Sequence, residues 1–218
     1  LLKFSDNRLL VEAALFGQAG FLDHNPVDSY YAQLKHEFDL LRHRFNLSPI
    51  DISVWKFFRL RPANFPTIRL AQLAALISQN SDFTGAILHS KTVDEFAHFF
   101  HQPVSDYWQS HINFGKETKR HYSQPGDEAS TNILINTVIP FLFVYGLQHD
   151  DEILKNKAVS WLEETKPEDN HIIRKWIELG AVIDNARQSQ AYLELKNNYC
   201  NHHRCLECQI GCRLVAEV

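Results

Sequence analysis

Apolar residues recur at helical spacing along most of the chain. Between positions 25 and 46 they are spaced three and four residues apart and therefore fall on one face of a helix: Tyr30, Leu34, Phe38, Leu41 and Phe45. Asn25 is expected to cap this helix, with Pro26 in its first turn. Another helix is expected directly after Asp6 and Asn7, so the two predict a helical hairpin.

The same periodicity predicts further helices along the rest of the chain. They are expected at Ile52 to Leu60, Thr67 to Ser78, Asp106 to Asn113, Thr131 to Leu147, Asp151 to Glu164 and His171 to Leu179. No internal repeat, coiled-coil heptad run or alternating strand pattern of any length is found. The sequence therefore predicts an all-α fold, a multi-helix array around one core, with a cysteine-rich metal-binding tail at the C-terminus.

The stretch "GKETKRHYSQPGDEAS", residues 115–130, is the most loop-like part of the chain. It is the best position for a subdomain boundary. We otherwise expect one helical domain over residues 1–199, with residues 200–218 as a tail packed on it.

Composition limits the classes of function. The chain has 218 residues, is 44% hydrophobic and carries a net charge of -4, which argues against a protein that generally coats nucleic acid or membrane surfaces. The apolar run from Ile133 to Leu147 is short for a membrane span and predicts a buried core helix, in which Asn132 and Asn136 would be core hydrogen-bonding groups. Without a secretion signal, we expect a cytoplasmic protein with reduced cysteines and no membrane partner.

All four cysteines lie close to the C-terminus, at Cys200, Cys205, Cys208 and Cys212. This C-x4-C-x2-C-x3-C spacing predicts a metal site, because thiolates are soft ligands that suit zinc or an iron–sulfur cluster. The spacing does not separate the two metals. Thiol redox chemistry through Cys205 and Cys208 is an alternative, and His202 or His203 could replace one sulfur.

A second candidate site is the segment "WKFFRLRPANFPTIR", residues 55–69, called here the cationic segment. Its cations and polar residues could hold a phosphate or carboxylate group, while its aromatic rings could stack on bases. The anion-binding or nucleic-acid-binding candidates are Lys56, Arg59, Arg61, Asn64 and Arg69. In the alternative interpretation the rings are core and the arginines pair with acidic residues.

"SDYWQSHINFGK" contains a third and less specific candidate, in which Asp106, His111 and Lys116 could include a catalytic pair. Asp106 and His111 are five residues apart and would not share one helix face, so solvated polar residues are the simpler interpretation. No phosphate-binding glycine loop or recognised catalytic motif is present.

The chain resembles a family catalogued as domain of unknown function 2851, a bacterial family. The resemblance rests on "EAALFGQAGFL", "WKFFRLRPANFPTIRLAQLAAL", "NTVIPFLFVYG" and "LKNNYCNHHRCLECQIG". It implies that this chain is the C-terminal helical half of a longer protein whose N-terminal half contains strands. In the tail it includes Cys200, Cys205 and Cys208 but not Cys212, so a histidine or an external group could be the fourth ligand.

Three functions are open at this point, and the residues name no reaction. The first is a helical module with a structural metal clip that binds nucleic acid or another anionic partner beside an N-terminal half. The second is an enzyme for a small anionic substrate, with residues from the Arg61 to Arg69 turn and the Asn132 to Asn136 helix. The third is a purely structural or protein-interaction domain.

Overall fold

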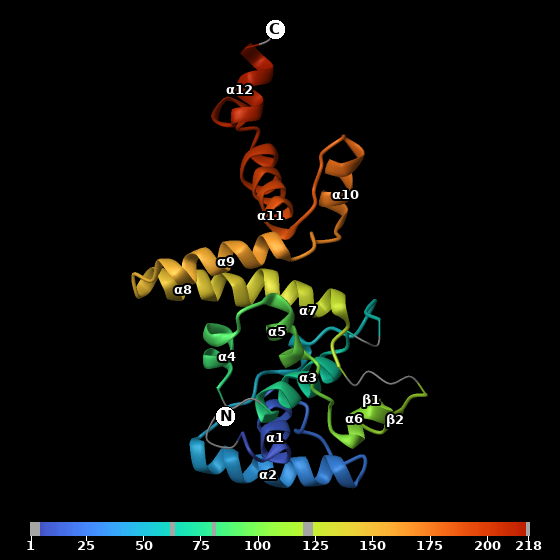
Figure 1. Ribbon diagram of the computed structural model, residues 1–218. Helices are drawn as coiled ribbons and strands as arrows, with labels where there is room; N and C mark the ends of the chain where they lie inside the picture. The colour runs from blue at the N-terminus through green and yellow to red at the C-terminus, as the bar shows by residue number, and fades with distance from the viewer. Residues whose placement is uncertain (1–4, 62–63, 80–81, 120–123, 217–218) are drawn as a thin grey trace. The chain divides into compact units, whose positions relative to one another are not determined.

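The structure is a computed structural model, and it describes residues 5–61, 64–79, 82–119 and 124–216. The regular structure of these residues is helical apart from one short two-stranded hairpin (Figure 1), which confirms the predicted all-α class. The chain divides into two compact units. The first is Leu1–Ser90 with Asp94–Gly126, and the second is Lys91–Val93 with Asp127–Val218.

The first unit is built from short and medium helices followed by the hairpin. In chain order its elements are α1 (Arg8–Gln18), α2 (Ser29–Phe45), the 3-10 helix η2 (Ile52–Val54), α3 (Pro66–Gln79), α4 (Phe83–His89), α5 (Val93–Ala97), the 3-10 helix η4 (His98–Phe100), α6 (Asp106–Ser110), β1 (His111–Asn113) and β2 (Lys116–Glu117). The two strands pair antiparallel, with His111 opposite Glu117.

The second unit begins with one long helix that changes its winding. Its elements are α7 (Asp127–Ile133), the π-helix η5 (Leu134–Val138), α8 (Ile139–Gln148), α9 (Glu152–Glu164), α10 (His171–Glu178), α11 (Ala186–Glu194), the π-helix η6 (Leu195–Tyr199), the 3-10 helices η7 (Cys200–His202) and η8 (Cys205–Glu207), and α12 (Gln209–Ala216).

Side-chain caps set where the first two helices begin. α1 begins directly after Asp6 and Asn7 as predicted, and Asn7 is the cap, since its side chain accepts a hydrogen bond from the backbone N–H of Leu10. The predicted start of α2 was wrong. Asp28, not Asn25, is the cap, and its carboxylate accepts a hydrogen bond from the N–H of Tyr31 at 2.7 Å. The helix ends at Phe45, and the next residue, Asn46, adopts the left-handed conformation with φ of 49°.

Two predicted helices are shorter than expected. Only Ile52–Val54 is helical in the first, because the next residues are fixed by tertiary contacts: the indole N–H of Trp55 donates to the carbonyl of Ala19. The second ends at Ser110 and continues as β1. The turn that follows β1 needs a residue with positive φ, which Gly115 supplies.

The core of the first unit lies where α1 packs against α2 and α3. Phe16 is fully buried and stacks on Trp108, with ring centroids 4.8 Å apart. Gly17 lets the two helices approach closely, because a Cβ atom there would lie 2.0 Å from the ring of Phe38. This contact explains why a glycine is needed in the last turn of α1, where the ring of Phe38 leaves no room for the side chain of an alanine.

In the second unit, α8 and α9 form the most extensive helix pair, in which Leu142, Ala158 and Trp161 are buried. The buried core helix expected here is buried on one face only, since Phe143 and Leu147 are exposed. The continuous helix Asp127–Gln148 is long and apolar enough, by length and composition alone, to cross a membrane, which is weak evidence because core helices pass the same test.

Candidate functional site: the cationic segment and the cysteine tail

The cationic segment is an irregular connection between η2 and α3. It follows η2, whose cap Asp51 accepts a hydrogen bond from the N–H of Ser53 at 2.8 Å. The chain then turns through Arg59, which has a φ of 64°. A non-glycine residue in this left-handed region is uncommon and strained, and such strain clusters at functional sites.

The aromatic residues of the segment divide between the core and the surface. Trp55, Phe57 and Phe65 pack against the core of the first unit, and the ring of Phe57 meets that of Phe65 edge-on with centroids 5.2 Å apart. Phe58 is 82% exposed. The guanidinium of Arg59 lies over its ring, 5.2 Å from the centroid. Trp55, Phe57 and Phe65 therefore pack on the core, as the alternative interpretation expected, whereas Phe58 does not.

Arg69 differs from the other cations because it is half-buried at the start of α3. Its guanidinium donates to the amide oxygens of Asn64 at 2.6 Å and Gln72 at 2.8 Å. Burial lowers the pKa of Arg69 below its ordinary value. It is bonded to neutral groups, so its charge is not offset there by a carboxylate, and it holds Asn64 in place beside the exposed cations.

The remaining three cations, Lys56, Arg59 and Arg61, are exposed. None of them forms an ion pair with an acidic residue that the structure describes, whereas five other cations do. In the described part of the chain, Arg59 and Arg61 therefore do not pair with acidic residues, contrary to the alternative interpretation. The segment presents positive charge and one aromatic ring to solvent. Pro62 and Ala63, between Arg61 and Asn64, lie outside the described residues.

A buried carboxyl group in the first unit was missed by the sequence analysis. Glu12 is 1% exposed and accepts a hydrogen bond from the hydroxyl of Tyr30, which lies 3.2 Å from Ser105 Oγ. Glu12 Oε1 has no hydrogen-bond partner among the described residues. Burial raises the pKa of Glu12 above its ordinary value. A charged residue inside "LLVEAALF" was the available signal, because its neighbours on that helix face are apolar.

The ring of Tyr30 stacks on that of Tyr107, with centroids 4.2 Å apart. The Tyr107 hydroxyl donates to Asp28 Oδ2 at 2.6 Å and accepts from the N–H of Gly115. Burial alone would raise the pKa of Asp28, but the hydrogen bonds from Tyr107 and backbone N–H groups lower it. Asp28 therefore remains a carboxylate that ties the start of α2 to the hairpin.

The less specific candidates Asp106, His111 and Lys116 lie in α6 and the hairpin, and no hydrogen bond or ion pair joins them in the described ranges. Asp106 accepts a hydrogen bond from Gln109, and His111 Nδ1 lies 2.9 Å from the carbonyl oxygen of Tyr107. Lys116 is exposed on β2. The local partners of Asp106 and His111 and the exposure of Lys116 favour the interpretation of the three as polar residues without a catalytic role.

Asn132 and Asn136 are exposed, so their expected role as core hydrogen-bonding groups was wrong. The amide of Asn136 donates to Asn132 Oδ1 at 2.7 Å and to Glu168 Oε1 at 2.9 Å. Gln190 donates to the other oxygen of Glu168. Asn136 lies in the π-helix η5, a winding often found at functional sites. This pair belongs to the second unit and the cationic segment to the first.

The four cysteines are free thiols, half-buried or exposed. Cys205 and Cys208 are joined by a closed turn in which the N–H of Cys208 donates to the carbonyl of Cys205 at 3.3 Å. Cys212 follows one helical turn later, with its N–H on the carbonyl of Cys208 at 2.8 Å and its Sγ 2.9 Å from the carbonyl oxygen of Leu206.

Gly211 allows α12 to lie against this turn. A Cβ atom at that position would lie 2.2 Å from the carbonyl oxygen of Cys205, closer than any real contact. Because Gly211 has no side chain, the backbone of Cys205, Cys208 and Cys212 can form one compact loop.

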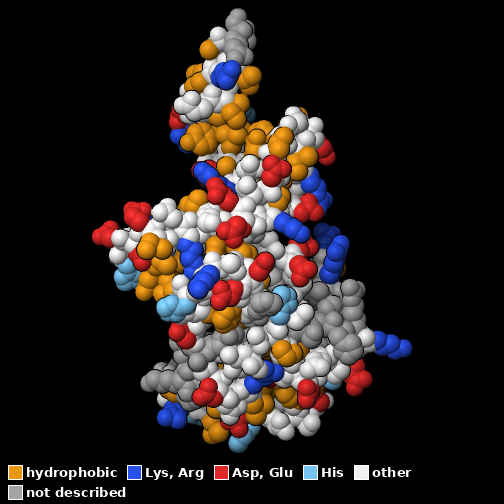
Figure 2. Space-filling view, viewed as in Figure 1, with side chains coloured by type: hydrophobic (Ala, Val, Ile, Leu, Met, Phe, Trp, Pro, Cys, Tyr) orange, Lys and Arg blue, Asp and Glu red, His pale blue; other side chains and the backbone are white. Residues whose placement is uncertain are grey.

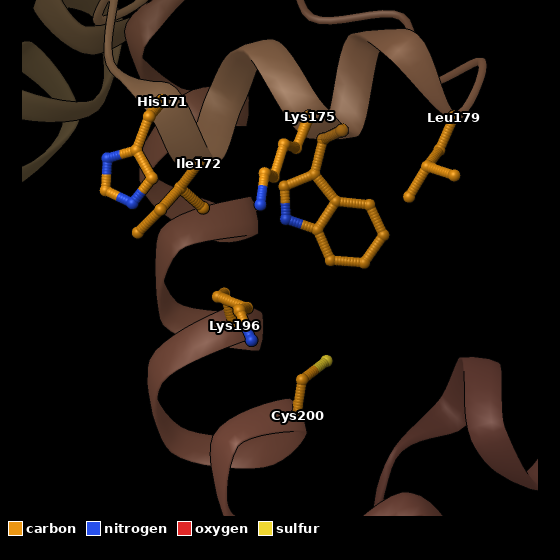
Figure 3. Close-up of a pocket in the computed structure, with 7 residues that line it drawn as sticks. His171, Ile172, Lys175, Leu179, Lys196 and Cys200 are labelled. Atoms are coloured by element: carbon orange, nitrogen blue, oxygen red, sulfur yellow. The ribbon is translucent and has the colours of Figure 1, made fainter.

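Cys200 has different surroundings. It lines a pocket with residues of α10, among them Ile172 and Lys175 (Figure 3). Trp176 also lines this pocket. In the described part of the chain, no three Cys, His, Asp or Glu side chains come together as a set that could hold a metal ion. His202 and His203 are exposed.

Comparison with models of protein families matches residues 1–171 to the family described as "Protein of unknown function (DUF2851)". The match covers more than half of the chain and includes the cationic segment, while the cysteine tail follows it. Neither the curated proteins nor the solved structures contain a match to this chain.

Proposed function

The chain belongs to the DUF2851 family, described as proteins of unknown function, and we propose that its first unit binds single-stranded nucleic acid through the cationic segment. The observation that carries this proposal is the pairing of an 82% exposed Phe58 with the guanidinium of Arg59. Proteins that bind single-stranded nucleic acid combine exposed aromatic rings with cations, because bases stack on the rings and phosphates are attracted to the positive charge.

The charges around Phe58 support a phosphate-bearing partner. Lys56, Arg59 and Arg61 are exposed without a described acidic partner, so binding a phosphate would not require breaking an ion pair. Asn64, held by Arg69, adds a neutral hydrogen-bonding group. The net charge of the chain is -4, so this attraction is local to the segment.

The proposal can be tested by fluorescence anisotropy with a labelled oligothymidylate. Phe58→Ala removes the stacking ring and is expected to weaken binding about fivefold or more, because one stacked base contributes roughly 1–3 kcal/mol. Replacing Lys56, Arg59 and Arg61 together with glutamine is expected to remove most of the binding.

The matched control is Arg44→Gln. Arg44 also lies over a phenylalanine ring, that of Phe45 at 5.5 Å, but at the end of α2. It should bind the oligonucleotide like the wild type. Equal binding by all four proteins would contradict the proposal, and so would equal affinity for a double-stranded DNA, whose bases are not available for stacking.

We also propose that the tail binds one structural metal through Cys200, Cys205, Cys208 and Cys212, as zinc or as an iron–sulfur cluster. The compact loop formed by the last three cysteines favours this proposal. A bound metal would draw the sulfurs together, since zinc–sulfur bonds are about 2.3 Å long. Cys200, from the neighbouring pocket, would have to join them.

Elemental analysis of anaerobically purified protein, with its visible spectrum, tests the metal proposal. Stoichiometric zinc, or iron with sulfide and broad visible absorption, would support it and select the metal. Cys208→Ser should lower the metal content, whereas His203→Gln should not if four thiols are the ligands. Protein with neither metal, purified under these conditions, would contradict the proposal.

A further inference from the structure

The second unit contains a groove between α10 and the helical segment that carries Lys196 and Cys200 (Figure 3). Its volume is about 350 Å³. This lies in the lower part of the range found for small-molecule sites, roughly 300–1,000 Å³. The groove is separate in sequence from the cationic segment and is not used by the proposed nucleic-acid site.

The walls of the groove are apolar. They are formed by Ile172 and Trp176 of α10 and by Leu179, which directly follows this helix. The Trp176 ring is supported from α11 by Tyr192, with centroids 5.0 Å apart. Hydrophobic side chains also gather on the surface of this C-terminal part of the unit (Figure 2). An apolar ligand body would therefore be buried against a ring already held in position.

Every ionisable side chain that lines the groove is basic or a thiol. The basic ones are His171, Lys175 and Lys196, and no acidic residue is among the lining residues. Lys196 Nζ donates to the neutral amide of Asn201 at 2.6 Å, and Lys175 forms no ion pair with an acidic residue in the described ranges. Two ammonium groups thus remain without counter-charge in a protein whose net charge is -4.

From this arrangement we infer that the groove binds a small organic acid with an apolar body and one carboxylate. The body packs on Ile172, Trp176 and Leu179, and the carboxylate bridges Lys175 and Lys196. The lining offers few polar groups, so a nucleobase would lose the hydrogen bonds of its edges on binding.

The test uses the whole chain labelled with 5-fluorotryptophan. The four tryptophans give separate fluorine resonances, and the one lost in Trp176→Phe belongs to Trp176. Titration with octanoate is expected to shift this resonance and leave the three others in place. Octanol, which has the same chain and no charge, should shift it only at higher concentration.

Variants separate the two parts of the site. Lys175→Met and Lys196→Met should each weaken octanoate binding about two- to fivefold, in keeping with an exposed ion pair, and leave octanol unchanged. Leu179→Ser should weaken both ligands alike, and Lys166→Met, outside the groove, should weaken neither.

The inference is overturned if octanoate leaves the Trp176 resonance unmoved, if octanol binds as tightly as octanoate, or if the two lysine variants bind octanoate like the wild type. None of these outcomes bears on the binding of nucleic acid by the first unit, because Phe58 and its neighbouring cations are untouched by these variants.

Discussion

At the scale of single residues, the first unit is defined by polar groups placed inside an apolar core. Glu12 is buried with one oxygen bonded to Tyr30 and the other without a described partner. Burial of a carboxylate is costly, and this cost is the physical reason for its raised pKa. Stability of the first unit is therefore expected to depend on pH.

Glu12→Gln should change this pH dependence. The folded pKa of Glu12 lies above the unfolded value of 4.5, so the group stabilises the fold fully below pH 4.5, and this contribution is lost as the pH rises through the folded pKa. Glutamine cannot ionise. The free energy of unfolding of the variant, relative to the wild type, should therefore increase between about pH 4 and about pH 8.

Urea unfolding at the two pH values measures this difference. Asp169→Asn is a suitable control, because Asp169 is a surface carboxylate on Arg174 whose pKa is lowered rather than raised. The free energy of unfolding of Asp169→Asn, relative to the wild type, should not increase between the two pH values. If Glu12→Gln and the wild type kept the same difference at both pH values, burial of an ionisable Glu12 would be refuted.

At the scale of elements, close backbone approaches depend on particular glycines. Gly211 lets α12 rest against the carbonyl of Cys205, and Gly17 lets α1 rest against Phe38. Periodicity predicted where most helices lie, because it reflects which face is buried. It did not predict these approaches, since a glycine in a helix carries no apolar signal of its own.

Gly211→Ala should open the terminal loop. The added Cβ would collide with the Cys205 carbonyl, so the amide N–H of Cys212, which donates to Cys208, should exchange with solvent faster than in the wild type. Gly126→Ala is the matched control, because a Cβ there meets nothing within 4 Å. Hydrogen exchange followed by NMR compares the two, and unchanged protection in Gly211→Ala would contradict the tight contact.

Errors at the ends of elements came from contacts between distant residues. The expected helix from Ile52 to Leu60 is shortened because Trp55 is bonded to Ala19. Asp28 caps α2 locally through Tyr31, and its carboxylate is also fixed by Tyr107 and Gly115. Ala19, Tyr107 and Gly115 are distant in sequence from the residues they contact, so no local pattern reports them. The local sequence predicted the start of a helix where the capping residue directly precedes the apolar pattern, as at Asn7 and Asp151.

At the scale of the whole molecule, the all-α class followed from the sequence, and the candidate site followed in part. The cluster of cations and aromatic residues in the sequence identified the cationic segment. The structure shows that its arginines have different surroundings. Arg69 is bonded to neighbouring amides, while Arg59 is exposed and lies over the ring of Phe58. The exposure of Phe58 was not predictable, because "WKFF" places four large side chains together without showing which one the core leaves out. The apolar groove on α10 was missed because its residues come from separate helices.

The central claim is that the cationic segment binds single-stranded nucleic acid through its unpaired charges. It is tested most directly by the salt dependence of oligothymidylate binding in the wild type and in the protein with Lys56, Arg59 and Arg61 replaced by glutamine. Each phosphate contact contributes about -0.7 to the slope of log K against log salt concentration on a single strand, so loss of three contacts should make the slope shallower by about 2. Identical slopes for the two proteins would contradict the claim.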